Sequence, residues 1–283
     1  MKYLLSFIGC LLCLAANPVL ANKKENFSEY YKQDCSFVVG QPADSNDWCN
    51  RGNADGTPPN VVIIGDSYGN SFTTILEEVA LQKNSKLIYE QYGHGQCPGI
   101  LDYGPKKWCA NFSQEVFNKI KNTPSINTVI MAIHWPYYLA SSWRWNESNL
   151  AYSQEETSKA LEKTIIAYRK IGKNVVFVYA SPGIANPKVC AERRIRISNA
   201  LDQCKVTKVA AMDGQYYRPY LDPMLKRLNV AIFDPMVYLC NATECKVRDG
   251  NKIFYASQAH LSGFGGQYLA RKAAPELKQL LNY

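Results

Sequence analysis

The sequence predicts an α/β fold built on a central parallel sheet of about five strands. Short apolar runs rich in β-branched and aromatic residues alternate with segments of helical periodicity, which is typical of a parallel sheet with helices on both faces. A polar, turn-rich stretch precedes the first run, so the sheet begins after it. The five predicted strands span residues 61–64, 87–92, 128–134, 174–179 and 230–233.

The segments between these strands carry apolar residues at helical spacing. The first predicted helix follows Ser67, and its buried stripe comprises Phe72, Ile75, Leu76, Val79 and Ala80. A second stripe runs from Ala160 to Tyr168, and a final helix is predicted from about Gly265 through Leu281. Asp249-Gly250, ahead of that final helix, predicts a hairpin turn.

The chain divides into three predicted parts. Residues 1–21 combine Lys2, an apolar stretch and Val19-Leu20-Ala21, which is typical of a secretory signal cleaved after Ala21. A membrane anchor is the less favoured alternative, because the apolar run is shorter than the ~20 residues that a spanning helix needs. Residues 22–58 are polar and are predicted to form a disulfide-stapled extension. Residues 59–283 are long enough for one complete α/β domain.

Two of the ten cysteines fall in the predicted signal, which leaves eight. An even number in an exported chain indicates disulfides, and these cysteines occur as four pairs of close neighbours. The alternative is a zinc site, but C-x-x-C spacing is absent among these eight cysteines and the three histidines lie in unrelated contexts. We therefore expect no metal ion and no other cofactor. The predicted bonds are Cys35–Cys49, Cys97–Cys109, Cys190–Cys204 and Cys240–Cys245.

The net charge of +8 arises from 32 basic and 24 acidic residues that are scattered along the chain. Scattered positive charge favours contact with anionic envelope surfaces, although an ordinary solvated surface explains it as well. The sequence has no run of basic residues interleaved with aromatic ones, so we expect no nucleic-acid partner.

The chemistry is predicted from two short segments. Gly65-Asp66-Ser67 follows the first predicted strand, and a sharp turn there places a serine hydroxyl at the carboxyl edge of the sheet, where open α/β folds bind ligands. His260-Leu261-Ser262 lies just before the last predicted helix. A histidine brought back to the same edge can accept the proton of that hydroxyl.

Four parts of the sequence, taken together and in order, carry a family resemblance. They are residues 61–67, Gln96-Cys97-Pro98, Ala132-Ile133-His134-Trp135, and the closing Cys240, Cys245, Gly250, Tyr255 and His260-Leu261-Ser262. These parts resemble the SGNH/GDSL hydrolase superfamily and, more closely, the SGNH domain fused to membrane-bound acyltransferases that O-acetylate bacterial envelope glycans. The resemblance spans Pro59 to the C-terminus and implies a three-layer, flavodoxin-like fold.

The resemblance implies that Ser67 is the nucleophile and His260 the general base. It also implies an oxyanion site formed by the backbone N–H of Ser67 with that of Gly93 or Gly95. The asparagine donor that the family often adds is absent from residues 128–135.

The family's acidic residue, three positions before the histidine, is Ser257 here. Loss of that carboxylate costs other serine hydrolases roughly 10⁴ in turnover. A backbone carbonyl, Ser257 itself or an acid from elsewhere remain the candidate partners that orient His260.

Aromatic residues follow the third predicted strand at the ligand-binding edge. Sugar rings stack on such side chains, and His134, Trp135 and Trp143 are the predicted substrate-lining residues. Packing under a loop is the alternative, and a structural or lining role for His134 is favoured over a role as a base.

The resulting hypothesis is an exported serine esterase or O-acyltransferase, periplasmic or extracellular, that acts on acyl esters of an envelope polysaccharide or glycan. The sequence shows no multi-spanning acyltransferase portion, so a transferase would need a separate membrane partner as acyl donor. The competing hypothesis is a non-catalytic glycan-binding or accessory protein that has lost the triad acid.

Overall fold

The computed structural model describes residues 47–48, 57–104, 107–140, 153–184, 190 and 204–282. The predicted signal segment, most of the predicted extension and the Cys35–Cys49 bond lie outside these residues. Trp143 also lies outside them.

The centre of the molecule is a six-stranded sheet in which five strands are parallel and the first is an antiparallel edge strand. The five parallel strands confirm the predicted sheet and occur where the five apolar runs stand in the sequence. In spatial order the strands are β1 (Asp47–Trp48), β3 (Tyr89–His94), β2 (Val61–Gly65), β4 (Thr128–Ala132), β5 (Asn174–Val178) and β7 (Ala231–Phe233).

Strand β2 holds the functionally important place in this order. It lies between β3 and β4, so the chain leaves β2 toward one side of the sheet and later crosses to the other side. In open α/β sheets this reversal leaves a crevice outside the carboxyl ends of the central strands, where ligands bind. The residues that directly follow β2 therefore lie at the mouth of that crevice.

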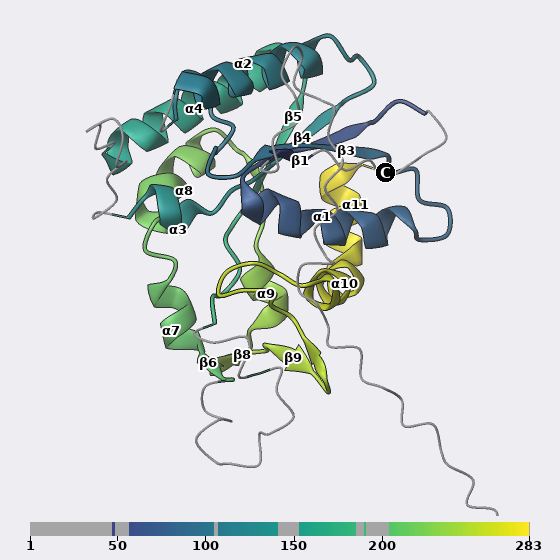
Figure 1. Cartoon of the computed structure of the whole chain (residues 1–283), viewed down its shortest axis with the longest axis vertical. Helices are drawn as coiled ribbons and strands as arrows, with labels where there is room; N and C mark the ends of the chain where they lie inside the picture. Colours follow the sequence, from purple (N-terminus) through teal and green to yellow (C-terminus); the bar gives the residue numbers. More distant parts are fainter. Residues whose placement is uncertain are drawn as a thin grey trace, which may run out of the picture.

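The helices form the two outer layers of a three-layer fold. Helices α2 and α4 cover one face of the sheet, whereas α1 and α10 lie together on the other (Figure 1). The main helices are α1 (Ser67–Ala80), α2 (Lys107–Lys121), α4 (Gln154–Lys170), α8 (Arg218–Arg227), α10 (Gly263–Lys272) and α11 (Ala274–Leu281). The shorter elements are α3 (Trp135–Tyr138), α7 (Lys208–Asp213), α9 (Pro235–Leu239), β6 (Val206–Thr207), β8 (Glu244–Cys245), β9 (Arg248–Asp249) and β10 (Lys252–Ile253).

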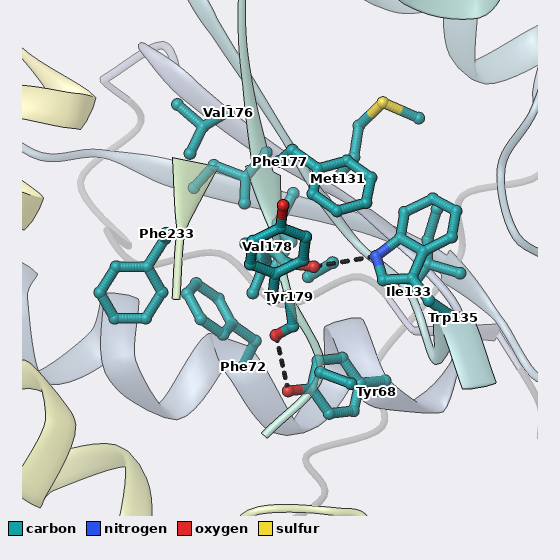
Figure 2. Packing of buried hydrophobic residues seen from close by; sticks show 14 of the residues in the cluster. Tyr68, Phe72, Met131, Ile133, Trp135, Val176, Phe177, Val178, Tyr179 and Phe233 are labelled. Atoms are coloured by element: carbon teal, nitrogen blue, oxygen red, sulfur yellow. Dashed lines mark hydrogen bonds between the residues drawn. The ribbon is translucent and has the colours of Figure 1, made fainter. Parts of the chain in front are cut away.

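Aromatic packing fixes the layers around the central strands (Figure 2). Phe72 of α1 meets Phe233 of β7 edge to face, with ring centroids 5.6 Å apart. On the opposite side, Trp135 stacks on Phe177 at 4.5 Å. Burial of each such side chain contributes about 1.5–3 kcal/mol, so the strand ends that carry the site rest on a rigid base.

The predicted final helix is in fact two helices, α10 and α11, separated at Ala273. The cause is Pro275, which lies in the first turn of α11. Proline has no N–H to donate, and its ring clashes with the carbonyl four residues earlier in a continuous helix, so the chain begins a new helix instead. The predicted hairpin turn is confirmed, because β9 and β10 pair antiparallel around Gly250, whose φ is +57°.

Three of the predicted disulfides are present in the described part of the chain. They join Cys97 to Cys109, Cys190 to Cys204 and Cys240 to Cys245, each the nearest cysteine in sequence. Among the described residues, none of the helices combines the length and the apolar character that crossing a membrane requires.

Candidate active site

The turn after β2 holds Ser67 at the start of α1. Gly65 has a φ of +151°, and a Cβ at this position would lie 2.0 Å from the carbonyl oxygen of Ala132. Only glycine allows the two strands to approach this closely. The next residue, Asp66, caps the helix, because its carboxylate accepts the backbone N–H of Tyr68 at 2.8 Å. The turn therefore presents the Ser67 side chain at the carboxyl edge of the sheet.

The loop that carries the histidine is held by backbone bonds on both sides. The N–H of Ala256 donates to the carbonyl of His260 at 2.9 Å, and Ser262 N–H donates to Phe254 O at 2.9 Å. Ser262 then caps α10 through Gly265 N–H. These bonds close a short loop whose tip returns to β2.

A further backbone bond ties this loop to the segment after β5. The N–H of Ile184 donates to the carbonyl of Gln258 at 2.8 Å. The histidine loop is thus held by bonds within residues 254–262 and by a bond to the segment after β5, which gives His260 a defined position.

The structure brings Ser67 and His260 together across 193 residues of sequence. The Oγ of Ser67 lies 2.7 Å from Nε2 of His260, and both side chains are half-buried. At this distance the hydroxyl donates to the neutral imidazole, so the proton already points along the path of transfer. The pair has the geometry of a serine nucleophile with its general base.

Ser257 lies on the other side of the imidazole. Its Oγ is 2.6 Å from Nδ1 of His260. Because Nε2 accepts the proton of Ser67, Nδ1 carries the ring hydrogen and donates it to Ser257. A hydroxyl oxygen orients the ring and fixes its tautomer, but it has no charge to stabilise the imidazolium. Burial lowers the pKa of His260, as expected for a cation that forms in a desolvated site.

Asp66 is a buried carboxylate that joins two parts of the site. In addition to capping α1, it accepts the backbone N–H of His134 at 3.3 Å from each oxygen. Burial raises the pKa of Asp66 to about 6, although the bonds from the backbone N–H groups of Tyr68 and His134 oppose the rise. Sequence reasoning gave Asp66 no role. The available signal was its place between a buried strand and a helix, which is the N-cap position.

His134 follows β4 and faces the reacting pair. Its ring centroid lies 6.4 Å from that of His260. The ring is nearly parallel to those of Tyr68 and Tyr137, at 6.1 Å from each centroid and with interplanar angles of 16° and 19°. Burial, and secondarily the charge on His260, lowers the pKa of His134 to about 4, so this imidazole is neutral at pH 7.

The substrate-lining prediction does not hold for Trp135. Its side chain is fully buried, stacks on Phe177, and donates its indole N–H to the carbonyl of Val178 at 2.9 Å. A ring in this position has no face to offer a sugar, so Trp135 is a core residue, and packing is the correct interpretation of this aromatic. Trp143 lies outside the described residues.

The predicted oxyanion glycines lie close to the nucleophile turn. Gly93 pairs with Gly65 in the register of β3 against β2, and Gly95 follows two residues later. The structure also places Gly99 there, which sequence reasoning did not single out. Its φ is +67°, and a Cβ on it would lie 3.7 Å from the backbone nitrogen of Gly65. The donor roles of Gly93 and Gly95 remain predictions.

A metal-binding cluster is not found within the described ranges, where no three His, Cys, Asp or Glu side chains are arranged to hold an ion.

A parallel sheet in the order 3-2-4-5-7, with a Gly-Asp-Ser turn after its central strand and a C-terminal histidine, defines a protein of the SGNH-hydrolase class. A family model described as "SGNH domain (fused to AT3 domains)" matches residues 33–275. The chain therefore belongs to this family of SGNH domains.

A solved structure with a TM-score above 0.5 shares the fold, and two others are similar at lower scores. The periplasmic domain of a lipopolysaccharide acetyltransferase from Salmonella ser. Paratyphi A is similar with a TM-score of 0.61 at 20% identity, over 79% of this chain and 85% of that one. An aryl esterase from M. smegmatis has a TM-score of 0.47 at 10% identity, over 78% and 99% of the two chains. The carbohydrate acetylesterase Est24 from Sinorhizobium meliloti has a TM-score of 0.46 at 13% identity, over 78% and 99%. No curated protein matches the chain in sequence.

Proposed function

We propose that this protein is an exported serine esterase or O-acyltransferase that acts on acyl esters, chiefly acetyl esters, of an envelope glycan. The observation that carries the proposal is the 2.7 Å hydrogen bond between Ser67 Oγ and His260 Nε2 at the carboxyl edge of the sheet. A serine hydroxyl is a weak nucleophile until an adjacent base accepts its proton, and this geometry supplies that base.

The reaction proceeds through an acyl-enzyme. Ser67 Oγ attacks the acyl carbonyl while its proton moves to Nε2 of His260, and the carbonyl π electrons move to oxygen. The tetrahedral centre then collapses, the departing alcohol takes the proton from His260, and the acyl group stays on Ser67. Water or a sugar hydroxyl resolves the ester by the same steps in reverse. Backbone N–H groups of Ser67 and of Gly93 or Gly95 are the proposed oxyanion donors.

Three observations support an envelope glycan as the substrate and an exported location. The family is that of SGNH domains fused to AT3 domains, and the similar Salmonella domain is described as periplasmic and as part of a lipopolysaccharide acetyltransferase. The three disulfides are typical of an oxidising compartment. Residues 1–21 have the pattern of a secretory signal. N-terminal sequencing of the protein from the envelope fraction should begin at Asn22; a start at Met1 would contradict cleavage.

Hydrolysis and transfer share the acyl-enzyme and differ in the acceptor that resolves it. A transferase would take its acyl group from a separate membrane partner. Incubation of acetyl-loaded protein with glycan acceptors, followed by mass spectrometry, distinguishes the two reactions. Acetylated glycan identifies a transferase, whereas free acetate alone identifies an esterase.

Ser257 favours one alternative function, a glycan-binding or accessory protein with a weakened or lost activity. The position that orients the base holds a neutral hydroxyl, so Ser257 supplies no negative charge to the imidazolium formed during acylation. Retention of the bond between Ser67 and His260 argues for the enzyme.

A serine-reactive fluorophosphonate and p-nitrophenyl acetate separate these functions. The wild-type protein should be labelled at Ser67 and should hydrolyse the ester, and Ser67→Ala should lose both. Ser71→Ala is the matched control, because Ser71 lies one turn further along α1 and its hydroxyl only donates to the carbonyl of Tyr68. A wild-type protein that is neither labelled nor active would support the accessory function instead.

A further inference from the structure

His134 has an imidazole whose ring makes no hydrogen bond within the described part of the chain, although its backbone N–H is bonded to Asp66. The ring is half-buried and lies at the edge of the site, 6.4 Å from the ring of the base. The ring nitrogens of His134 are not among the described buried polar atoms that lack a partner, so water can bond to them in the free protein. An imidazole with no protein partner at the edge of the site is therefore available to bond a group that arrives with the substrate.

The surroundings of His134 fix its orientation. The rings of Tyr68 and Tyr137 lie nearly parallel to the imidazole, each with its centroid 6.1 Å away. The Asp66 carboxylate holds its backbone at the end of β4 and at the same time caps the helix that begins with Ser67. The position of the imidazole relative to the nucleophile is thus set by one shared carboxylate, which is the preorganisation that a catalytic donor needs.

We propose that the neutral imidazole of His134 donates a ring N–H to the oxyanion that forms when Ser67 attacks an acyl carbonyl. This inference rests on the proposed function and adds a catalytic residue to it. No covalent bond to His134 forms or breaks, and the imidazole keeps its proton throughout. The acyl oxygen gains negative charge while the proton of Ser67 moves to His260, and the N–H of His134 stabilises that charge.

The charge state of the ring supports this role. Burial keeps the pKa of His134 near 4, so the imidazole is neutral at pH 7 and does not oppose the protonation of His260 during acylation. Other enzymes also use a neutral imidazole, with a lowered pKa, to polarise a substrate carbonyl. A second positive charge 6.4 Å from the base would instead disfavour the imidazolium that the mechanism requires.

The alternative is that His134 only packs against Tyr68 and Tyr137. Two substitutions separate this from the proposal. His134→Phe keeps a flat ring for stacking and removes the donor, whereas His134→Asn loses the ring and keeps a donor. A purely structural role predicts that Phe is tolerated better than Asn, and a donor role predicts the reverse.

The experiment measures kcat and KM for p-nitrophenyl acetate and the rate of fluorophosphonate labelling at pH 7. Removal of one oxyanion donor typically costs about 10²–10³ in kcat, so His134→Phe should lose this much with KM nearly unchanged. His134→Asn should recover at least about tenfold of that loss. Labelling should follow kcat, because the phosphoryl oxygen takes the place of the oxyanion. Thermal unfolding of each variant reports whether the fold is intact.

Tyr216→Phe is the matched control for displacement of α3. The Tyr216 hydroxyl donates to the carbonyl of Pro136, two residues after His134, and it contributes nothing to the reacting groups. This variant should stay within about twofold of wild type, a change of about 0.4 kcal/mol in the barrier.

The outcomes are distinguishable. An active wild type with an equally active His134→Phe variant overturns the donor role and leaves the proposed function intact. Equal losses in the Phe and Asn variants also overturn it, because the ring itself is then required. A wild-type protein that is neither labelled nor active refutes the proposed function, and the donor role is refuted with it.

Discussion

Asp66 provides a test of the site's electrostatics that does not depend on any substrate. Burial raises the pKa of this carboxyl from 3.8 to about 6. Between pH 3.8, the pKa of this carboxyl in the unfolded chain, and about pH 6, its pKa in the folded protein, the folded protein binds more protons. The free energy of unfolding therefore decreases as the pH rises through this range. At about 1.4 kcal/mol for each pH unit between the two pKa values, the ionised carboxylate lowers stability at pH 7 by about 3 kcal/mol.

His134 acts in the opposite direction over nearly the same range. Burial lowers the pKa of its imidazole from 6.5 to about 4, so there the unfolded chain binds more protons than the folded protein. The free energy of unfolding therefore rises with pH through this window, again by about 3 kcal/mol. In the wild-type protein the effects of Asp66 and His134 on the pH dependence of the unfolding free energy nearly cancel. Each effect becomes measurable when the other residue is substituted.

We therefore expect the stability of Asp66→Asn, relative to wild type, to increase by about 2.4 kcal/mol from pH 4 to pH 7. At pH 4 the carboxyl of the wild type is largely protonated and resembles the amide. At pH 7 only the wild type carries the buried charge. The constant cost of an amide that faces the N–H of His134 shifts the whole curve and leaves its slope unaffected.

The measurement is urea-induced unfolding at pH 4, 5, 6 and 7 with intact disulfides. His134→Phe is the control with the opposite sign, because its stability relative to wild type should fall as the pH rises to 6.5. Parallel curves for wild type and Asp66→Asn would show that Asp66 is ionised at the same pH in the folded and unfolded states, and would refute the reasoning.

Three further predictions concern the frame of the site. Ser257→Ala should lower kcat/KM for an acetyl ester, because Nδ1–H of His260 loses its acceptor. Ser257→Asp should raise kcat/KM by about tenfold, which corresponds to about 1.4 kcal/mol of added stabilisation of the imidazolium. An unchanged kcat/KM in the Asp variant would mean that the missing charge does not limit the rate. Gly65→Ala should lower the melting temperature sharply and abolish labelling, since its Cβ would overlap the carbonyl of Ala132; a wild-type melting curve would contradict this. Non-reducing peptide mapping should recover four local disulfides, and long-range pairs or several free thiols would be inconsistent with that pattern.

Strand positions could be predicted from the sequence because each central strand is a short apolar run with a clear boundary. The run beginning at Val61 follows two prolines and starts in the structure at the predicted residue. The third strand was predicted to continue to His134 but ends at Ala132. The reason is a contact that the sequence does not reveal, since Asp66 draws the N–H of His134 out of the sheet register.

The same limit applies to the aromatic residues after β4. Their composition is visible in the sequence, but the side on which each ring lies depends on partners far away. Trp135 is buried because the Val178 carbonyl and the Phe177 ring lie opposite it, more than forty residues later. By contrast, the division between α10 and α11 follows from Pro275, which the sequence displays.

The substitution at position 257 separates two contributions that a triad carboxylate usually makes together. One is orientation, since the acceptor at Nδ1 decides which nitrogen faces the nucleophile, and the 2.6 Å bond to Ser257 retains it. The other is charge, which Ser257 does not supply, and burial lowers the pKa of His260. The loss of about 10⁴ in other serine hydrolases reflects a wrong tautomer, and that defect is absent here. In this site the loss of rate is therefore limited to the missing stabilisation of the imidazolium. Catalysis then depends more strongly on the N–H groups that stabilise the oxyanion formed in the same step.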